Sequence, residues 1–326
     1  MRFLITVLLL GVLAVGGWIA WALYTPVTPP PHAALLLRSG YSTRQIAAEL
    51  RNAGVIRSPL AFRLWHRLHP KPALKAGEYL FEHPATLPEV YDRIAHGDIY
   101  FHEVTIPEGY NMFDIAKAME DAGLGSAQDF LKIAETRTDL ISDLAPEAKS
   151  LEGYLFPNTY QFTRTQSLED MAGVMVHQFR QVLQQVGLNS DVHRIVTMAS
   201  IVEKETAAPE ERAQVASVYY NRLARRMALD ADPSVIYALL LAGNYSGSLH
   251  HEDLSTKSPY NTYRYPGLPP GPIGNPGGSA LEAAMHPANT AFLYFVSNGN
   301  GHHRFARNLT EHNKNVAAYR RAMGMR

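Results

Sequence analysis

The chain has 326 residues, of which 46% are hydrophobic and 18% charged, so it can bury a core and is not a disordered chain. Its 30 lysines and arginines balance 30 aspartates and glutamates, and no basic stripe is present, which argues against nucleic acid as a partner. The absence of cysteine excludes disulfides, thiolate nucleophiles and cysteine-bound zinc. At this length we expect about two domains.

Residues 3–23 form an uncharged run that is long enough, at 1.5 Å per residue, to cross about 30 Å of hydrocarbon. Trp18 and Trp21 lie near its end, where indole rings favour the headgroup layer, and Arg2 lies on the other side. We predict a single-pass helix in the cytoplasmic (inner) membrane, with the rest of the chain on the extracytoplasmic, periplasmic side. The alternative is a cleaved signal peptide, because residues 20–22 loosely fit a small-x-small cleavage site. Either alternative exports the rest of the chain.

Residues 24–33 form a proline-rich linker that contains Pro26, Pro29, Pro30 and Pro31. Such tracts are extended and semi-rigid. We therefore predict a spacer that holds the following domain away from the bilayer.

Residues 34–103 are predicted to form a small α+β subdomain, because apolar residues alternate with helix-capping and turn signals. The predicted elements are a strand at 34–37, helices opened by Ser42 and Ser58, a strand at 77–81 and a helix at 87–95 that stops at Gly97. The order strand, helix, helix, strand resembles the LysM module, which binds N-acetylglucosamine polymers. The pattern is generic, so a purely structural subdomain is the alternative.

Residues 104–326 are predicted to form a mainly helical α+β domain. Helical patterns run to about residue 133, an aromatic loop follows at 152–157, and another helix covers 167–186. Residues 258–278 contain six prolines and five glycines and form either a long ordered loop or a disordered one. Long loops that are ordered usually carry function.

The helix predicted at 194–206 ends in a candidate catalytic carboxylate. Glu205 continues the apolar stripe of this helix, whereas Glu203 lies about 200° away around the axis. A partly desolvated carboxylate beside the helix break at 207–208 has a raised pKa, which suits a general acid. The alternative is that Glu205 forms a structural ion pair or a cap across the break. The stripe consists of Ile195, Met198, Ala199 and Val202.

The segment after the break contributes further carboxylates. Pro209 is predicted to begin a helix that runs to about residue 227. Asp232 precedes Pro233, and this pair predicts that Asp232 caps the next helix. Asp232 is also a candidate for a second catalytic carboxylate, but the capping role explains it without one.

Several segments together resemble the YceG-like endolytic murein transglycosylase family, and the match covers essentially the whole chain. An acid at Asp230 stands where relatives often have a neutral polar residue, which puts a shared role for Asp230 in doubt. Pro272 and Gly274 are small departures within the loop. The matching segments are 199–206, 215–223, 232–237, 260–263, 267–277, 283–287, 293–296 and 312–313.

The resemblance implies cleavage of the β-1,4 bond between N-acetylmuramic acid (MurNAc) and N-acetylglucosamine (GlcNAc) in nascent peptidoglycan strands, leaving a 1,6-anhydroMurNAc end. The catalytic glutamate of the family is the second one of the Glu-Lys-Glu-Thr motif, which is Glu205 here and agrees with the stripe argument. No protein nucleophile is needed, because the C6 hydroxyl of the muramoyl ring attacks the anomeric carbon. The resemblance also implies penicillin-binding wall synthases as neighbours.

Five further residues are predicted to bind the glycan strand. Tyr260, Asn261 and Tyr263, at the head of the loop, are expected to stack on sugar rings or hydrogen-bond to them. Asn221 and Asn275 are expected to hold acetamido groups. For each residue the alternative is a hydrogen bond within its own loop.

We expect neither a metal nor a cofactor. Adjacent histidines, as at 250–251 and 302–303, point in different directions and lack a third ligand at a useful spacing. The glycine-rich runs lack the strand and helix context of a phosphate-binding loop.

Two other functions remain as alternatives. One is a two-carboxylate hydrolase of the muramidase type that uses Glu205 with Asp230 or Asp232, since ordinary glycosidases use two carboxyl groups. The other is a non-catalytic peptidoglycan-binding scaffold.

Overall fold

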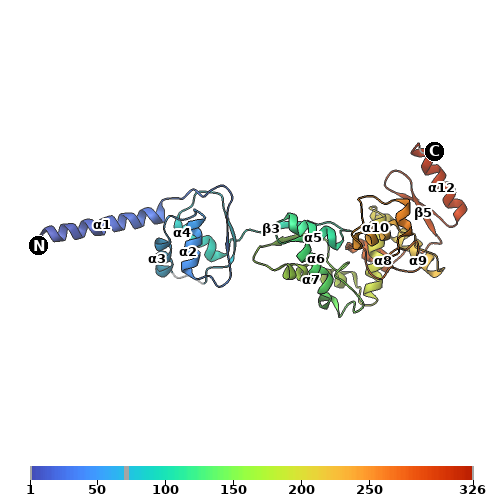
Figure 1. The fold of residues 1–326 in the computed structure, drawn as a ribbon, viewed down its shortest axis with the longest axis horizontal. Coiled ribbons are helices and arrows are strands. Elements are labelled where there is room, and N and C mark those ends of the chain that lie inside the picture. Colours follow the sequence, from blue (N-terminus) through green and yellow to red (C-terminus); the bar gives the residue numbers. More distant parts are fainter. Residues whose placement is uncertain (1, 70–72, 325–326) are drawn as a thin grey trace. The chain divides into compact units, whose positions relative to one another are not determined.

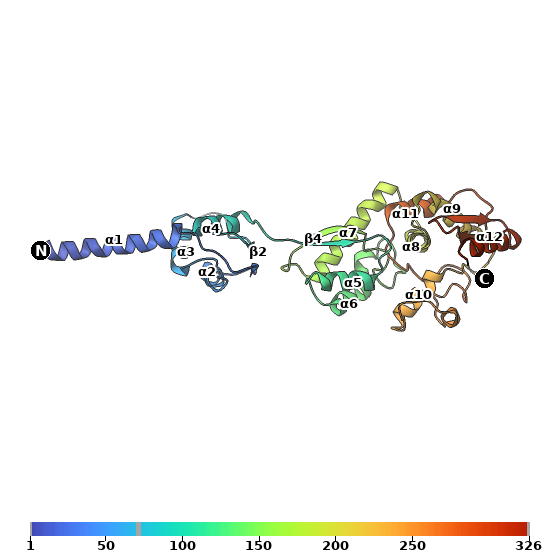
Figure 2. The ribbon, with the colours of Figure 1, turned by 90° about the horizontal axis from the view of Figure 1, so that it is seen from above.

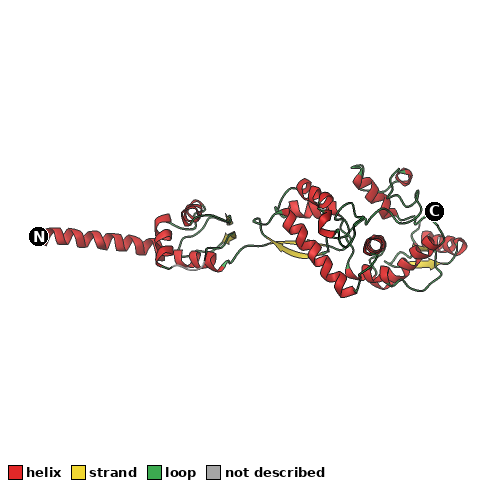
Figure 3. Ribbon diagram, turned by 90° about the horizontal axis from the view of Figure 1, so that it is seen from below, coloured by secondary structure: helices red, strands yellow, loops and turns green. Residues whose placement is uncertain are grey.

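The structure is a computed structural model, and it describes residues 2–69 and 73–324. The chain divides into two compact units. Unit 1 comprises residues 1–103 and 161–167, and unit 2 comprises residues 104–160 and 168–326. Helices dominate and the sheets are small (Figure 3), so the expected mixture of helices and strands is confirmed. The return of residues 161–167 to unit 1 was not predicted.

Helix α1 (Arg2–Tyr24) opens unit 1 (Figure 1). Within the described residues it is the one helix that is both long and apolar enough to cross a membrane. Its last turn belongs to the core of unit 1, because Ala22 and Leu23 are buried and Ile19 packs against that core. The apolar helix therefore continues directly into a folded domain.

The remainder of unit 1 follows the predicted order of elements. Strands β1 and β2 pair antiparallel, with Ala33 opposite Phe81 and Leu37 opposite Gly77. Leu35, Leu37, Tyr79 and Phe81 are buried in the core between the strands and the helices. The elements are β1 (Ala33–Leu37), α2 (Thr43–Asn52), α3 (Pro59–Leu68), β2 (Gly77–Phe81) and α4 (Leu87–His96).

Local signals fix the ends of these helices. The Ser42 side chain accepts the Gln45 N–H while the Gln45 side chain accepts the N–H of Ser42, which forms a capping box at α2. Ser58 caps α3 in the same position before Pro59. Gly97 ends α4 in the left-handed conformation, with φ 76°. The predicted caps and stop are confirmed.

The proline-rich tract at 24–33 differs from its prediction as a spacer. The N–H of Val27 donates to the carbonyl of Ala85 at 2.8 Å, and the N–H of Ala85 returns a bond of 3.1 Å. The Arg57 guanidinium donates to the carbonyls of Thr25 and Pro26. Proline lacks the backbone N–H but keeps its carbonyl oxygen as an acceptor. Here Arg57 and the N–H of Ala85 donate to carbonyl oxygens of the tract. The tract is therefore part of unit 1, while its predicted effect on the distance between this unit and a bilayer stays a prediction.

Unit 2 is built around α8, which Figure 2 views nearly end-on with α9, α10 and α11 around it. Strand β3 pairs with β4, and β5 pairs with β6 as an antiparallel hairpin covered by α12. The elements are β3 (His102–Ile106), α5 (Met112–Asp121), α6 (Ala127–Thr136), β4 (Asn158–Phe162), α7 (Leu168–Val186), α8 (Val192–Glu205), α9 (Arg212–Ala224), α10 (Asp232–Leu241), α11 (Gly278–Met285), β5 (Tyr294–Ser297), β6 (His303–Ala306) and α12 (Leu309–Ala322). Short 3₁₀ turns occur at Thr138–Ile141, Pro209–Glu211 and His251–Ser255.

Two helix starts differ from the sequence prediction. Pro209 opens a 3₁₀ turn and α9 begins only at Arg212, ending at Ala224 instead of about residue 227. The predicted cap at Asp232 is wrong, because α10 begins at Asp232 itself, with Ala231 in the cap position and no side-chain capping bond.

The loop at 258–278 is packed into unit 2, which decides between the two alternatives for this segment. Ile273 and Asn275 are buried, and the N–H of Ile273 donates to the Ser200 hydroxyl on α8 at 3.0 Å. The N–H of Gly109 donates to the carbonyl of Asn275 at 2.8 Å. Residues distant in sequence thus hold the loop against the central helix.

Gly153 marks the closest approach between the loop and the rest of unit 2. Its φ is 88°, and a Cβ there would lie 2.4 Å from Pro272 Cγ and 2.9 Å from Val196 Cγ1. We expect Gly153→Ala to lower the free energy of unfolding of unit 2 by about 2–4 kcal/mol, from left-handed strain and overpacking. Chemical denaturation followed by tyrosine fluorescence measures this change.

The matched control is Gly173→Ala, in the interior of α7, where a Cβ meets nothing within 4 Å. This variant should be as stable as the native chain or more stable by about 0.5–1 kcal/mol. Equal stability of both variants would contradict the close approach at Gly153.

Candidate active site

A pocket of about 410 Å³ lies in unit 2, where the end of α8 meets α9, the start of α10, β5 and α12. Carboxylates, a guanidinium and several rings share its wall. Such a mixture of a few convergent polar groups with aromatic rings is typical of a ligand site. The lining residues are Glu205, Tyr219, Arg222, Leu229, Asp230, Asp232, Tyr263, Tyr294, Phe295, Leu309 and His312.

Glu205 is the last residue of α8 and lines this pocket. The residue as a whole is partly exposed, while its carboxyl group is largely removed from water. Burial raises the pKa of Glu205 to about 7, and the negative charge of Asp232 adds to the effect. The Tyr219 hydroxyl donates a hydrogen bond to the carboxylate, and this bond and the positive charge of Arg222 act in the opposite direction. No lysine, arginine or histidine among the described residues forms an ion pair with Glu205.

Glu203, two residues earlier, occupies a separate environment. Its carboxylate accepts from the Arg212 guanidinium at 2.6 Å and from the N–H of Gly277 at 3.0 Å. The structural ion pair considered for Glu205 is therefore formed by Glu203. Helical spacing predicted this separation, because residues two apart face in different directions.

Arg222 lines the pocket and holds several backbone segments of its wall together. Its Nε donates to the carbonyl of Leu293 at 2.8 Å, and its Nη1 donates to the Asp230 carboxylate at 2.8 Å. Nη1 also lies 3.1 Å and 3.0 Å from the carbonyls of Ala228 and Leu229. Arg222 therefore ties α9 to the turn before α10 and to β5, and it neutralises Asp230.

Asp232 and Tyr263 form a second polar pair in the pocket. The Tyr263 hydroxyl donates to Asp232 Oδ1 at 2.5 Å. This contact explains why the predicted cap is absent, since the carboxylate turns toward the loop and away from the free N–H groups of α10. Asp232 thus lies in the same pocket as Glu205, as a second catalytic carboxylate would. Of the five predicted glycan-binding residues, Tyr263 is the one that lines this pocket.

Asn221 and Asn261 lie outside the lining of the pocket. Each donates two amide hydrogen bonds of 2.9 Å to backbone carbonyls of neighbouring loops. The structure therefore gives both side chains the loop contacts considered as the alternative, while their contact with sugars stays a prediction. The acceptors are Thr290 and Phe292 for Asn221, and Leu254 and Thr256 for Asn261.

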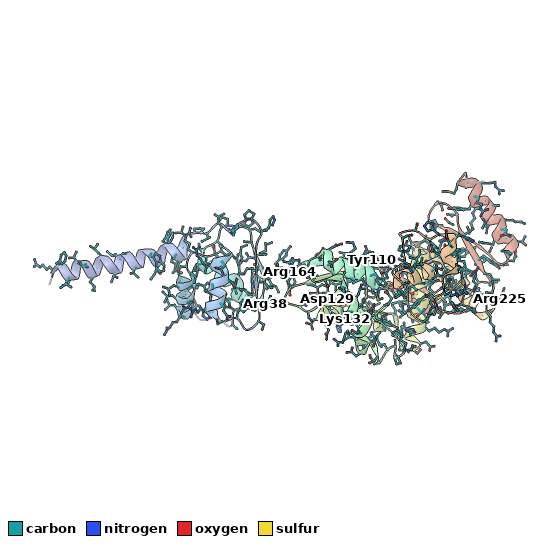
Figure 4. The ribbon with its side chains drawn as sticks, viewed as in Figure 1. Arg38, Tyr110, Asp129, Lys132, Arg164 and Arg225 are labelled. Carbon is teal, nitrogen blue, oxygen red and sulfur yellow. The ribbon has the colours of Figure 1, made fainter. Side chains whose placement is uncertain are left out.

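Asn275 is fully buried and connects the loop with Glu152. Its amide nitrogen donates to Glu152 and to the carbonyl of Tyr110, each at 2.9 Å, and its amide oxygen accepts from the N–H of Leu155. Tyr110 immediately precedes the Asn111 cap of α5 (Figure 4). Glu152 also accepts from the N–H of Met112 at 2.9 Å. This set of bonds joins the loop to α5 and to the aromatic segment at 152–157.

Tyr260 also lies outside the lining of the Glu205 pocket. Its ring centroid lies 5.1 Å from that of Tyr237, and its hydroxyl is 3.3 Å from the position of a Cβ on Gly271. Burial raises the pKa of Tyr260 to about 12. Tyr260 therefore packs between Tyr237 on α10 and Gly271 of the loop, and its predicted stacking on sugar stays a prediction.

Sequence reasoning missed the part that β5 and α12 play in the pocket. The ring of His312 stacks on that of Tyr294, with centroids 5.1 Å apart. His312 Nδ1 is buried and has no hydrogen-bond partner among the described residues. Burial, followed by the positive charge of Arg222, lowers the pKa of His312. The segment 312–313 belongs to the matched motifs, but its spacing from Glu205 gave no reason to place it in the pocket.

The histidines at 302 and 303 have structural partners. His303 Nδ1 lies 2.7 Å from Glu211, which also accepts the N–H of His303 at 3.0 Å. Across residues 2–69 and 73–324, no three histidine, aspartate or glutamate side chains gather as a metal site would require.

Comparison with known proteins places this geometry in a family. The chain matches the YceG-like family over residues 35–318 and therefore belongs to that family. An endolytic murein transglycosylase of Bacillus subtilis (strain 168) is 35% identical over 302 residues, covering 86% of this chain and 83% of that protein.

Two further relatives agree with this assignment. An endolytic murein transglycosylase of Streptococcus pneumoniae (strain D39) is 29% identical over 314 residues, which cover 86% of this chain and 57% of the relative. The 2.6 Å crystal structure of a yceG-like protein from Listeria monocytogenes superposes with a TM-score of 0.58 at 33% identity. It covers 86% of this chain and 97% of the Listeria chain.

The burial of Glu205 predicts a pH-dependent effect on stability. Because its pKa is raised from 4.5 to about 7, its contribution is fully present below pH 4.5 and is lost as the pH rises through 7. Glutamine loses no proton. We expect Glu205→Gln to gain about 1–3 kcal/mol in free energy of unfolding relative to the native chain between pH 4.5 and pH 8.

Denaturant titrations at several pH values measure this gain. The control is Glu135→Gln, which changes an exposed glutamate on α6 and should show no such trend. A pH-independent difference between Glu205→Gln and the native chain would mean that the carboxylate is solvated.

Proposed function

We propose that this chain is a membrane-anchored endolytic murein transglycosylase that cleaves the MurNAc-β-1,4-GlcNAc bond within nascent glycan strands and leaves 1,6-anhydroMurNAc ends. Membership of the YceG-like family and the names of the relatives from Bacillus and Streptococcus support this activity. The observation that carries it is Glu205, a carboxyl group in an open pocket with a raised pKa and no cationic partner among the described residues.

Glu205 acts first as a general acid. It gives its proton to the oxygen that leaves with C4 of GlcNAc as the bond from this oxygen to the muramoyl C1 breaks. A pKa near 7 leaves a substantial fraction of the carboxyl protonated at neutral pH, which the step requires. The positive charge that develops at C1 is shared with the ring oxygen and supported by the 2-acetamido group.

Glu205 then acts as a base in the same site. The C6 hydroxyl of the same muramoyl ring attacks C1, and its proton passes to the Glu205 carboxylate, which restores the acid. The glycosidic C–O bond is replaced by an intramolecular one, so no water is consumed and no protein nucleophile takes part. Intramolecular attack gains from the closeness of the reacting groups, and the aromatic wall of Tyr294 and Phe295 helps to exclude water.

The surroundings of Glu205 tune this cycle. The Tyr219 hydroxyl stabilises the carboxylate that forms after proton transfer, while Asp232 disfavours it. The opposing effects hold the pKa where the group can both lose and regain a proton. Arg222 and His312 are placed to meet polar groups of the sugar, and Tyr263 offers a ring and a hydroxyl.

Helix α1 anchors this activity to the cytoplasmic membrane in a single pass. The length and apolarity of α1 support the anchor, and Trp18 and Trp21 suit its outer interface. The catalytic unit then faces the periplasmic side, where glycan strands are made. Penicillin-binding synthases, which make those strands, are the proposed neighbours.

Unit 1 is proposed to be a LysM-like subdomain that binds the glycan. Its order of strand, helix, helix and strand supports the likeness. A hollow of about 490 Å³ within unit 1 is lined in part by Arg38 and Arg164 (Figure 4), whose guanidinium groups suit sugar hydroxyls and carbonyls.

Replacement of the catalytic carboxyl tests the chemistry. We expect Glu205→Gln to lower the rate on uncrosslinked glycan strands by a factor of about 10²–10⁴, the usual contribution of a general acid or base. Glu210→Gln, at an exposed position just after the helix break, should retain the native rate. Mass spectrometry of the products in ¹⁸O-labelled water should show anhydro ends without the label.

The outcomes separate the alternatives. Reducing MurNAc ends that carry ¹⁸O would identify a hydrolase, in which case Asp232 is the carboxylate that shares the pocket. Binding of glycan without any cleavage by the native chain would identify a scaffold.

The pH profile of the reaction tests the role of Tyr219. The rate should fall above about pH 7 as Glu205 loses its proton. Because the Tyr219 hydrogen bond lowers the pKa of Glu205, Tyr219→Phe should move this falling limb to higher pH by about one unit. Tyr220→Phe is the matched control, since that hydroxyl donates to the carbonyl of Ala284. An unmoved limb in Tyr219→Phe would remove Tyr219 from the proton-transfer site.

A further inference from the structure

Helix α3 carries an apolar stripe that no described residue of unit 1 covers. Leu60, Leu64 and Leu68 are 60%, 38% and 65% exposed, and their spacing of four residues places them along one side of the helix. The opposite side of α3 buries Ala61 and Phe62 in the core of unit 1. The three leucines are therefore surface residues, and the core contacts of α3 are made by its other side.

Basic side chains run beside the leucines. Arg63 and Arg67 are exposed and lie three residues after Leu60 and Leu64, so they form a parallel strip on the same exposed side. The helix contains no acidic residue. An exposed apolar stripe flanked by arginines is typical of a helix that lies in the interface of a membrane.

Contacts with α1 place α3 at the end of the membrane helix. The rings of Tyr24 and Trp65 meet edge to face with centroids 6.3 Å apart. Arg57, just before α3, lies over the Trp21 ring at 5.0 Å. Figure 1 shows α3 lying across the direction of α1, at the end of unit 1 that α1 enters.

The length of α1 sets the level of the membrane surface. At 1.5 Å per residue, about 20 residues cross 30 Å of hydrocarbon. Counted from Phe3, the outer boundary falls at Ala22, in the turn that enters the core of unit 1. The helix that contacts this turn, α3, is therefore at the height of the headgroups.

We propose that α3 is a second membrane contact, in which Leu60, Leu64 and Leu68 enter the outer headgroup layer while Arg63 and Arg67 bind anionic lipid phosphates. The inference rests on the proposed anchoring by α1. The occupant of the stripe is lipid because the stripe lies on the helix that contacts the end of α1 and because its arginines complement phosphate groups. The contact fixes the tilt of unit 1 against the bilayer.

Site-directed spin labelling of the full chain in lipid nanodiscs tests the proposal. The chain has no cysteine, so each label can be attached at a single introduced cysteine. The labelled variants are Leu64→Cys on α3, Val12→Cys in the middle of α1, and Ala48→Cys on the exposed side of α2 as the matched control. Collisions with oxygen, which concentrates in lipid, are compared with collisions with a water-soluble nickel chelate.

We expect the oxygen-to-nickel collision ratio at Leu64 to exceed that at Ala48 several-fold and to approach that at Val12. If the ratio at Leu64 equals that at Ala48 while the label at Val12 lies in lipid, the proposed membrane contact of α3 is wrong. The proposed anchoring by α1 would then still hold. A label at Leu64 shielded from both reagents would also overturn it, since protein would then cover the stripe. A water-exposed Val12 would refute the anchor itself.

Charge reversal provides the second test. In nanodiscs with anionic lipid, Arg63→Glu with Arg67→Glu should lower the collision ratio at Leu64, whereas Arg44→Glu with Arg51→Glu on α2 should leave it unchanged. An equal effect of both pairs, or of neither pair, would contradict the binding of phosphate by α3.

Discussion

The candidate site in unit 2 depends on one constraint, which is the free-energy cost of keeping the buried Glu205 carboxylate charged at the end of α8. The stripe on α8 that builds the core continues into Glu205, so the packing that stabilises the helix also removes water from this side chain. No cation among the described residues forms an ion pair with Glu205, and the positive charge of Arg222 lowers its pKa against the larger effect of burial. The fold pairs Arg212 with Glu203 and Arg222 with Asp230, and Glu205 accepts a hydrogen bond from the neutral hydroxyl of Tyr219. With burial as the largest effect, the pKa of Glu205 is raised to about 7, so this carboxyl exchanges its proton near neutral pH.

The loop at 258–278 shows how the chain supports this arrangement without regular structure. Its buried backbone needs hydrogen-bond partners, and Ser200 on α8 accepts the N–H of Ile273 while Glu203 accepts the N–H of Gly277. Glycines allow the loop to pass close to other backbone segments, as at Gly274, where a Cβ would lie 2.9 Å from the carbonyl oxygen of Gly109. Residues 271–277 of the loop are thereby buried in unit 2, and Tyr263, nearer its start, lines the pocket.

The elements of this protein were largely predictable, because capping residues and apolar periodicity are local signals. Ser42, Ser58 and Gly97 fixed helix ends, and the helical angle between Glu203 and Glu205 separated their roles. Contacts between residues that are distant in the sequence were not predictable. Asp232 has the sequence of a cap, yet Tyr263 competes for its carboxylate from 31 residues away. The proline-rich tract has the composition of a spacer, yet Arg57 and Ala85 hold it on unit 1. His312 reaches the pocket only because α12 packs on the β5–β6 hairpin.

The junction between α1 and unit 1 has a mechanical consequence. Ala22 and Leu23 lie in the same core as α2, α3 and α4, and the residues that follow are bonded to unit 1, so α1 passes into the domain without a flexible linker. Torque applied to α1 is therefore transmitted to unit 1. A rotation of α1 about its own axis would turn unit 1 by the same angle, because the end of the helix and the domain share one core.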